Sequence, residues 1–252
     1  MRLLLIITFL CINYFSVQAQ KYCPPLSGKL GGIKKYHINA GFGVTKLYGD
    51  IEDKISRSTA GFLGFDYQLI KGLYIGVEGQ MGALEQQWRN NTDPRRVRNE
   101  YLALGGLVTI HPVEVFSANK RAFRSDFSQN IIESFFISVG TYGVINNYEN
   151  IYRNLNDLRT IGPISSYDEN GDPIFDDRSK SLMLPSVAAG LAIPINKGFG
   201  MKNYVSLLIR GQFNFSNNEY LDGYVPYGND GFAVQGKNDF YNYFSLGLRY
   251  SL

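Results

Sequence analysis

Residues 239–252, DFYNYFSLGLRYSL, carry two kinds of side chain that alternate from one residue to the next. The large apolar set comprises Phe244, Leu246, Leu248, Tyr250 and Leu252. The residues between them are Tyr243, Ser245, Gly247, Arg249 and Ser251. Because successive side chains of a β-strand point to opposite faces, this period of two predicts a strand with one apolar face and one mostly small or polar face.

Seven more segments have the same strand character, and most of the eight are 11–14 residues long. In chain order the segments are 36–48, 58–69, 72–85, 99–111, 134–147, 182–194, 203–215 and 239–252. A strand of a globular protein has about 5–6 residues, whereas a tilted strand that crosses a membrane needs about 9–11. The sequence therefore predicts an all-β fold, an eight-stranded antiparallel transmembrane β-barrel of the size of OmpX and OmpA.

A soluble barrel of the lipocalin type, with its apolar faces turned inward, would alternate in the same way. Its interior would have to hold the Phe, Leu and Ile side chains of eight long strands. Its outer face would carry many Gly and Ser residues but few Lys or Glu residues, although strands that face water normally carry more charge. The membrane barrel is therefore the preferred interpretation, and lipids are its expected surroundings.

The N-terminus has the order of a secretory signal peptide, with a positive charge at Arg2 and an apolar run of about 15 residues that leads to Ala19. A helix that spans a membrane needs about 20 apolar residues, so a retained anchor is the weaker alternative. We expect residues 1–19 to be a signal peptide. Residues 20–252 are then a single barrel domain in a bacterial outer membrane.

The net charge and the cysteine content argue against a nucleic-acid partner and against an internal disulfide. The formal net charge is +3, and loss of Arg2 with the signal peptide lowers it to about +2, which does not indicate a nucleic-acid partner. Of the two cysteines only Cys23 remains after cleavage, so no internal disulfide is expected.

The predicted connections alternate in length. If the chain starts in the periplasm, the outer loops are 49–57, 86–98, 148–181 and 216–238, and the inner turns are 70–71, 112–133 and 195–202. Long outer loops and short inner turns are usual in outer-membrane barrels. The inner connection 112–133 departs from this pattern because it has about 20 residues.

This long inner connection contains apolar residues at rough helical spacing among Lys and Arg. The candidate residues for contact with a periplasmic partner are Val115, Phe116, Phe123 and Phe127. Two alternatives stay open, a helix that lies along the inner leaflet and a poorly ordered turn.

The inward faces of the predicted strands hold four charges: Asp66, Glu78, Arg210 and Arg249. An eight-stranded barrel encloses only enough space for side chains, and unpaired charges there would be costly. We therefore predict a lumen ion-pair network that plugs the barrel, and a gated pore is the alternative. The shear of the barrel decides which acid meets which base, and the sequence does not fix it.

No catalytic, cofactor or metal site is predicted. Lipid-modifying barrels need a nucleophile, a base and an orienting acid near the outer leaflet. The two histidines, His37 and His111, fall at the opposite, periplasmic strand ends, where we expect them to be polar residues at the membrane interface.

The segment 168–172, DENGD, resembles a calcium-binding loop over these five residues. The match fails because an EF-hand needs Gly and Glu at its sixth and twelfth positions, which here are Pro173 and Ser179. Asn170-Gly171 instead predicts a β-hairpin with a type I′ turn beyond the membrane, between segments 164–167 and 173–175.

The second outer loop holds a group of arginines, Arg89, Arg95, Arg96 and Arg98. These side chains either lie in water or bind lipopolysaccharide phosphates through charge-assisted hydrogen bonds. The sequence favours the solvated loop.

Two further stretches resemble a known family. The first predicted strand reads AGFGVTKL over residues 40–47 and ends in Tyr48-Gly49-Asp50. The last outer loop contains EYLDGY at 219–224 and returns through NDFY at 238–241. The chain is similar in these stretches to the PorG-like small outer-membrane barrels of Bacteroidota, which belong to the type IX secretion (gliding) apparatus.

The resemblance implies a non-enzymatic component that contacts periplasmic proteins of the secretion machine, and it supplies no catalytic residue. Segment 113–132 is where such a contact is expected, and the arm around Cys23 is a second candidate. The alternative function is a closed OmpX/OmpA-like barrel whose outer loops serve surface adhesion or envelope stability. A lipid-modifying enzyme is a third and weaker alternative.

Overall fold

The computed structural model describes residues 35–49, 51, 56–87, 94–116, 131–155, 157, 160–195, 205–225 and 238–252. The expected signal peptide and Cys23 lie outside these residues. Among the described residues, no helix has the length and apolar character needed to cross a membrane.

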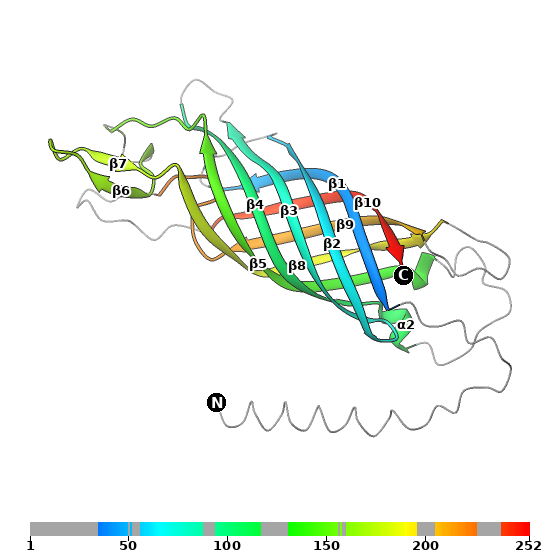
Figure 1. Ribbon diagram of the computed structural model, residues 1–252. Coiled ribbons are helices and arrows are strands. Elements are labelled where there is room, and N and C mark those ends of the chain that lie inside the picture. The colour runs from blue at the N-terminus through cyan, green and yellow to red at the C-terminus, as the bar shows by residue number, and fades with distance from the viewer. Residues whose placement is uncertain are drawn as a thin grey trace, which may run out of the picture. The chain divides into compact units, whose positions relative to one another are not determined.

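Eight long antiparallel strands form a closed barrel, which confirms the predicted fold (Figure 1). The strands are β1 (Tyr36–Tyr48), β2 (Ser58–Ile70), β3 (Leu73–Gln87), β4 (Arg96–Ile110), β5 (Phe135–Glu149), β8 (Arg178–Pro194), β9 (Val205–Ser216) and β10 (Phe240–Ser251). Their order around the wall is β1-β10-β9-β8-β5-β4-β3-β2, so chain neighbours pair and β1 closes the barrel on β10.

The strands match the eight predicted segments, but four of them extend by two or more residues further at the outer end. β3 ends at 87 instead of 85, β4 starts at residue 96 instead of 99, β5 ends at 149 instead of 147, and β8 starts at 178 instead of 182. Their outward-facing side chains in these extensions are charged or polar, so the apolar alternation that marks the rest of each strand is absent there.

The seam between β1 and β10 needs glycine. Gly41 pairs with Gly247, and a Cβ atom on Gly41 would lie 2.5 Å from Cα of Gly247 and 2.7 Å from Cε1 of Phe62. Real Cβ atoms do not approach other atoms so closely, and glycine therefore lets Phe62 pack flat against the seam. The Gly-x-Gly of β1 thus has a packing role.

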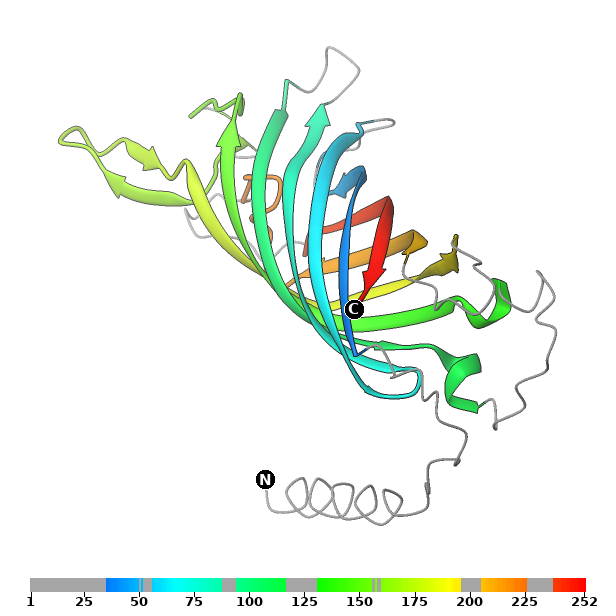
Figure 2. The ribbon, with the colours of Figure 1, turned by 45° about the vertical axis from the view of Figure 1, so that its right-hand side comes forward.

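A short hairpin, β6 (Ile164–Tyr167) and β7 (Pro173–Phe175), forms a separate two-stranded sheet beyond the outer ends of β5 and β8 (Figure 2). The predicted hairpin is confirmed, but its predicted type I′ turn is wrong. That turn needs positive φ at both central residues, whereas Gly171 has a φ of 87° and Asn170 is not among the positive-φ residues. The Asp168 carboxylate instead accepts the N–H groups of Asn170 and Asp172 and shapes a five-residue loop.

At the periplasmic end, the long inner connection begins with a short helix, α2 (Pro112–Phe116). It lies against the two-residue turn between β2 and β3, where Gly72 has a φ of 78°. A Cβ on Gly72 would lie 2.8 Å from Cγ2 of Val115, so this glycine serves both the turn and the close approach of the helix.

Candidate functional site

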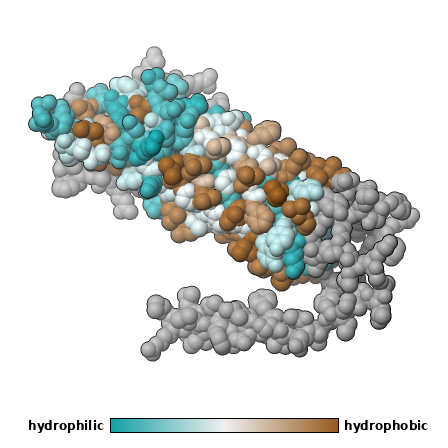
Figure 3. Space-filling model, in the orientation of Figure 1, coloured by the Kyte–Doolittle hydropathy of each residue, from teal (hydrophilic) through white to brown (hydrophobic). Residues whose placement is uncertain are grey.

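The exterior of the barrel is a band of exposed apolar side chains. Phe42 is 73% exposed, Leu63 is 63% exposed and Leu104 is 70% exposed. Figure 3 shows the apolar surface over the middle of the strands and a hydrophilic surface over their outer ends. A soluble protein does not expose an apolar surface of this extent, whereas a closed barrel presents one to lipid. The protein is therefore a membrane-spanning β-barrel of the bacterial outer membrane.

In the lumen, Arg210 of β9 meets Glu78 of β3 across the barrel. Its guanidinium binds both carboxylate oxygens, with Nη1 2.5 Å from Oε2 and Nη2 2.9 Å from Oε1. Gln80 and Tyr142 donate to Oε1 of Glu78 at 2.8 and 2.9 Å, and the guanidinium carbon lies 4.4 Å from the ring centroid of Phe62. Both charges are thus buried, paired and hydrogen-bonded, which is the condition for holding charge in a dry interior.

The second pair lies nearer the periplasmic end. Nη2 of Arg249 on β10 is 3.3 Å from Oδ2 of Asp66 on β2. Asn39 of the intervening strand β1 bridges them, because its amide nitrogen donates to Asp66 at 2.6 Å and its amide oxygen accepts from Arg249 at 2.8 Å. The structure therefore brings together the four charges named from the sequence, as two separate pairs.

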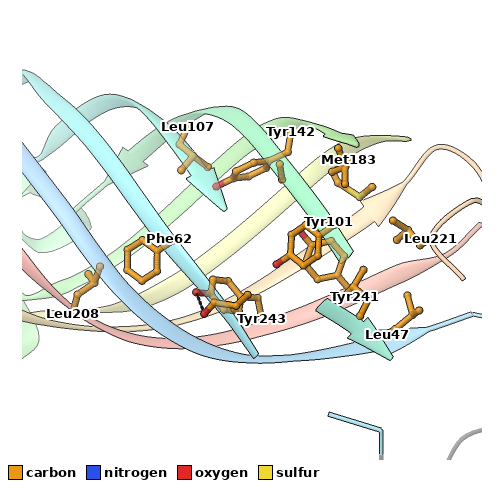
Figure 4. Close-up of a cluster of buried hydrophobic side chains, with 14 of the residues drawn as sticks. Leu47, Phe62, Tyr101, Leu107, Tyr142, Met183, Leu208, Leu221, Tyr241 and Tyr243 are labelled. Atoms are coloured by element: carbon orange, nitrogen blue, oxygen red, sulfur yellow. Dashed lines mark hydrogen bonds between the residues drawn. The ribbon is translucent and has the colours of Figure 1, made fainter. Parts of the chain in front are cut away.

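Large polar and aromatic side chains fill the remaining lumen. Residues with less than 2% exposure include Gln80, Tyr142, Gln212, Tyr241 and Tyr243. Figure 4 shows the tyrosine side chains pointing into the interior from different strands. Gln80 donates to Gln212 across the lumen at 3.0 Å. Side chains therefore plug the barrel at this level, and the sequence analysis missed the tyrosines because it considered only charges as the plug.

Both histidines lie inside the barrel, so their expected place at the membrane interface is wrong. His37 and His111 are 7% and 3% exposed. Nδ1 of His37 is 2.8 Å from Oγ of Ser251, and Arg249 donates to Nε2 of His111 at 3.3 Å. His37 occupies an inward position of β1, as the two-residue period from its buried neighbour Asn39 requires.

The segment of residues 217–225 folds inward at the outer end of the barrel. Leu221 and Tyr224 are almost fully buried, and Asn99 donates to the carbonyl oxygen of Leu221 at 2.8 Å. The Tyr224 hydroxyl lies 2.8 Å from the carbonyl oxygen of Arg96 and 2.9 Å from that of Tyr152, and burial raises the pKa of Tyr224 to about 12. The sequence analysis treated this stretch as an outer loop, and nothing in its local pattern distinguishes a loop that folds inward.

At the other end, α2 carries two exposed apolar side chains. Val115 is 41% exposed and Phe116 is 83% exposed, while the Tyr74 hydroxyl donates to Glu114 at 3.4 Å from within the barrel mouth. Burial raises the pKa of the Glu114 carboxyl above its usual value. Phe123 and Phe127, the other two candidate residues of this segment, lie outside the described residues.

Within the part of the chain that the structure describes, no group of three or more His, Cys, Asp or Glu side chains is arranged to hold a metal ion. Among the described residues, buried side chains fill the lumen, and residues 221–225 are buried at its outer end.

No protein-family model matches the sequence, and no curated protein is significantly similar to it. Among solved structures, Neisserial surface protein A is 13% identical, with a TM-score of 0.41, over 86% of this chain and 97% of that chain. The attachment invasion locus protein Ail of Yersinia pestis, solved with the heparin analogue sucrose octasulfate, is 11% identical, with a TM-score of 0.39, over 87% and 100%. OprG of Pseudomonas aeruginosa is 10% identical, with a TM-score of 0.36, over 87% and 96%. With TM-scores below 0.5, these similarities carry no argument about function.

Proposed function

We propose that the protein is a sealed, non-enzymatic outer-membrane component of a type IX-like secretion apparatus, and that it acts by contacting periplasmic partners. The observation that carries the proposal is the filled lumen, with Glu78 and Arg210 paired at its centre and tyrosines packed above them. A barrel with no free interior acts through its two ends. The assignment to a secretion apparatus rests on the sequence resemblance in residues 40–50, 219–224 and 238–241.

The periplasmic end offers a surface for such a contact. Phe116 projects from α2, which is fixed to the barrel by the close packing at Gly72 and by the Tyr74–Glu114 hydrogen bond. An aromatic side chain held on a fixed support resembles the anchors that dominate protein interfaces.

Site-specific photocrosslinking in cells tests this contact. A photoreactive amino acid at Phe116 is expected to capture periplasmic components of the secretion machine. The matched control places it at Ile174 on the outer hairpin, which is also exposed and apolar but faces outside the cell. Absence of capture from Phe116, together with an unchanged set of secreted proteins after deletion of the gene, would contradict the proposal.

The sealed lumen has its own test. Purified protein in planar lipid bilayers is expected to give no large, stable conductance, because paired charges and buried tyrosines occupy the described lumen. A reproducible open channel would show that the interior rearranges into a pore.

The second candidate function is surface adhesion, and the hairpin β6–β7 favours it. The hairpin projects beyond the barrel with Tyr167 64% exposed and Ile174 49% exposed. Deletion of residues 164–175 should abolish adhesion and leave secretion intact if this alternative holds. The secretion proposal predicts the opposite dependence, on Phe116.

We also propose that the protein is not an enzyme. Its two histidines are packed in the periplasmic half of the lumen, where a lipid of the outer leaflet does not reach them. Purified protein is expected to show no lipid hydrolysis above a detergent blank, and measurable turnover would overturn this part of the proposal.

A further inference from the structure

The outer rim of the barrel carries charged side chains on the face that borders the lipid. On β4 the outward residues change from Leu102 to Glu100 and Arg98 within four residues. The boundary between the acyl region and the headgroup region of the outer leaflet therefore crosses β3, β4, β5 and β8 at this level.

The acidic side chains of this rim gather around one arginine. Arg98 lies 2.5 Å from Glu85, 3.4 Å from Glu100 and 3.8 Å from Glu149. These three carboxylates come from three adjacent strands and meet the same guanidinium. These ion pairs neutralise Arg98 and engage all three carboxylates.

Two cations remain on the neighbouring strand. Arg178 and Lys180 are exposed on the outward face of β8, two residues apart, and no carboxylate of the described residues lies within 4 Å of either. Arg178 donates to the amide oxygen of Asn147 at 3.4 Å, which orients its guanidinium along the rim. A strand rises about 3.3 Å per residue, so the two cations are about 7 Å apart, close enough for one phosphate group to contact both.

A groove runs from Arg178 to the apolar wall. It has a volume of about 500 Å³, and its charged end is lined by Arg178, Arg98, Asn147 and Glu100. Lys180 lies beside the groove, where it pairs with the lining residue Ile145. Ile145, Leu102 and Met81 line the apolar end; Ile145 pairs with both Lys180 and Leu102, and Leu102 pairs with Met81. The small residue Ala83 of β3 also lines the groove.

We propose that this groove binds a phosphate-bearing lipid of the outer leaflet. Arg178 and Lys180 hold the phosphate through charge-assisted hydrogen bonds, for which the arginine fork is well suited. An acyl chain lies over Leu102, Ile145 and Met81. A free anion would use only the charged end of the groove, and an uncharged lipid only the apolar end, so the combination selects an anionic amphiphile.

Titration of the purified full-length barrel with diphosphorylated lipid A, with bound lipid counted by native mass spectrometry, tests the proposal. The double variant R178Q/K180Q is expected to bind about a hundredfold more weakly, since each of the two lost charge-assisted bonds costs roughly a factor of ten. The matched control, K46Q/R57Q, removes one lysine and one arginine of the same outer end that do not line the groove, and its affinity should stay within about twofold.

Two further comparisons separate the parts of the site. Lipid A without its phosphates should bind the wild type as weakly as diphosphorylated lipid A binds R178Q/K180Q. L102S should weaken binding of the intact lipid but leave the protein folded. The gel mobility of the unheated protein reports whether it is folded. Equal losses in both double variants would show mere attraction to charge. Full competition by inorganic phosphate would show that the acyl chain has no site. Either result overturns the proposal.

Discussion

Removal of one partner of the central ion pair should destabilise the barrel strongly. The change Arg210→Leu leaves the Glu78 carboxylate in the lumen, where the two side chains are only 6% and 3% exposed. Breaking a buried pair costs about 3–5 kcal/mol, because an uncompensated charge stays in a medium of low dielectric constant. Gln80 and Tyr142 still donate to Glu78, so we expect the lower part of that range, about 3 kcal/mol.

Two variants show whether the buried charge is the cause. The double variant E78L/R210L removes both charges and should recover most of the loss, since apolar replacement of a whole buried pair is often neutral. The control variant R98Q breaks the three ion pairs of Arg98 on the outer rim, where Arg98 is 44% exposed, and should cost clearly less than R210L, about 1 kcal/mol.

Urea unfolding in lipid vesicles, followed by the different gel mobilities of folded and unfolded barrel, measures these free energies. The reasoning is refuted if R210L unfolds within about 1 kcal/mol of the wild type, or if E78L/R210L is no more stable than R210L alone.

Three further changes act at other levels of the barrel. Gly41→Val should prevent closure of the β1–β10 seam, where even a Cβ has no room, and the yield of folded, heat-modifiable protein measures this; a normal yield would contradict it. Tyr224→Phe removes the hydroxyl contacts to Arg96 and Tyr152, at about 1–3 kcal/mol of loop stability, and faster proteolysis of the outer loops of the intact barrel should report it. Burial raises the pKa of the Glu114 carboxyl above its value in the unfolded chain. The protonated carboxyl therefore stabilises the folded state below the unfolded pKa, and this contribution is lost as pH rises through the folded pKa. Glu114→Gln should remove that part of the pH dependence, which begins as the pH rises above about 4, and a pH dependence of unfolding identical to that of the wild type would count against it.

The strands of the barrel wall can be predicted from the sequence because they follow one pattern. Every second residue of β10, from Phe244 to Tyr250, is apolar and exposed, and lipid tolerates almost any apolar side chain there. This pattern stops where the strands extend beyond the lipid. The outer parts of β4 and β8 stay paired by backbone hydrogen bonds while their outward side chains are Arg98, Glu100 and Arg178, so a search for apolar alternation stops short of them.

The candidate site is predictable only in part. The period of two places Glu78 and Arg210 on the inward faces, and the structure has both in the lumen. Which side chains meet depends on the stagger of all eight strands, which no single strand encodes. The same limitation applies to the inward-folded segment of residues 217–225. The buried hydroxyl of Tyr224 donates to carbonyl oxygens of residues 96 and 152, which are far away in the chain.

The two ion pairs also bear on how the barrel selects one stagger. A slip of one residue would turn a whole strand inside out and expose its polar face to lipid, so the apolar pattern alone excludes it. A slip of two residues keeps every side chain on its face, and the apolar pattern does not oppose it. Such a slip would, however, move a charge by about 6.6 Å along the strand, which separates Arg210 from Glu78 and Arg249 from Asp66. Because both pairs join strands that are not neighbours in the wall, such a slip would leave buried charges unpaired, which opposes it although hydrogen bonding between adjacent strands would accept it.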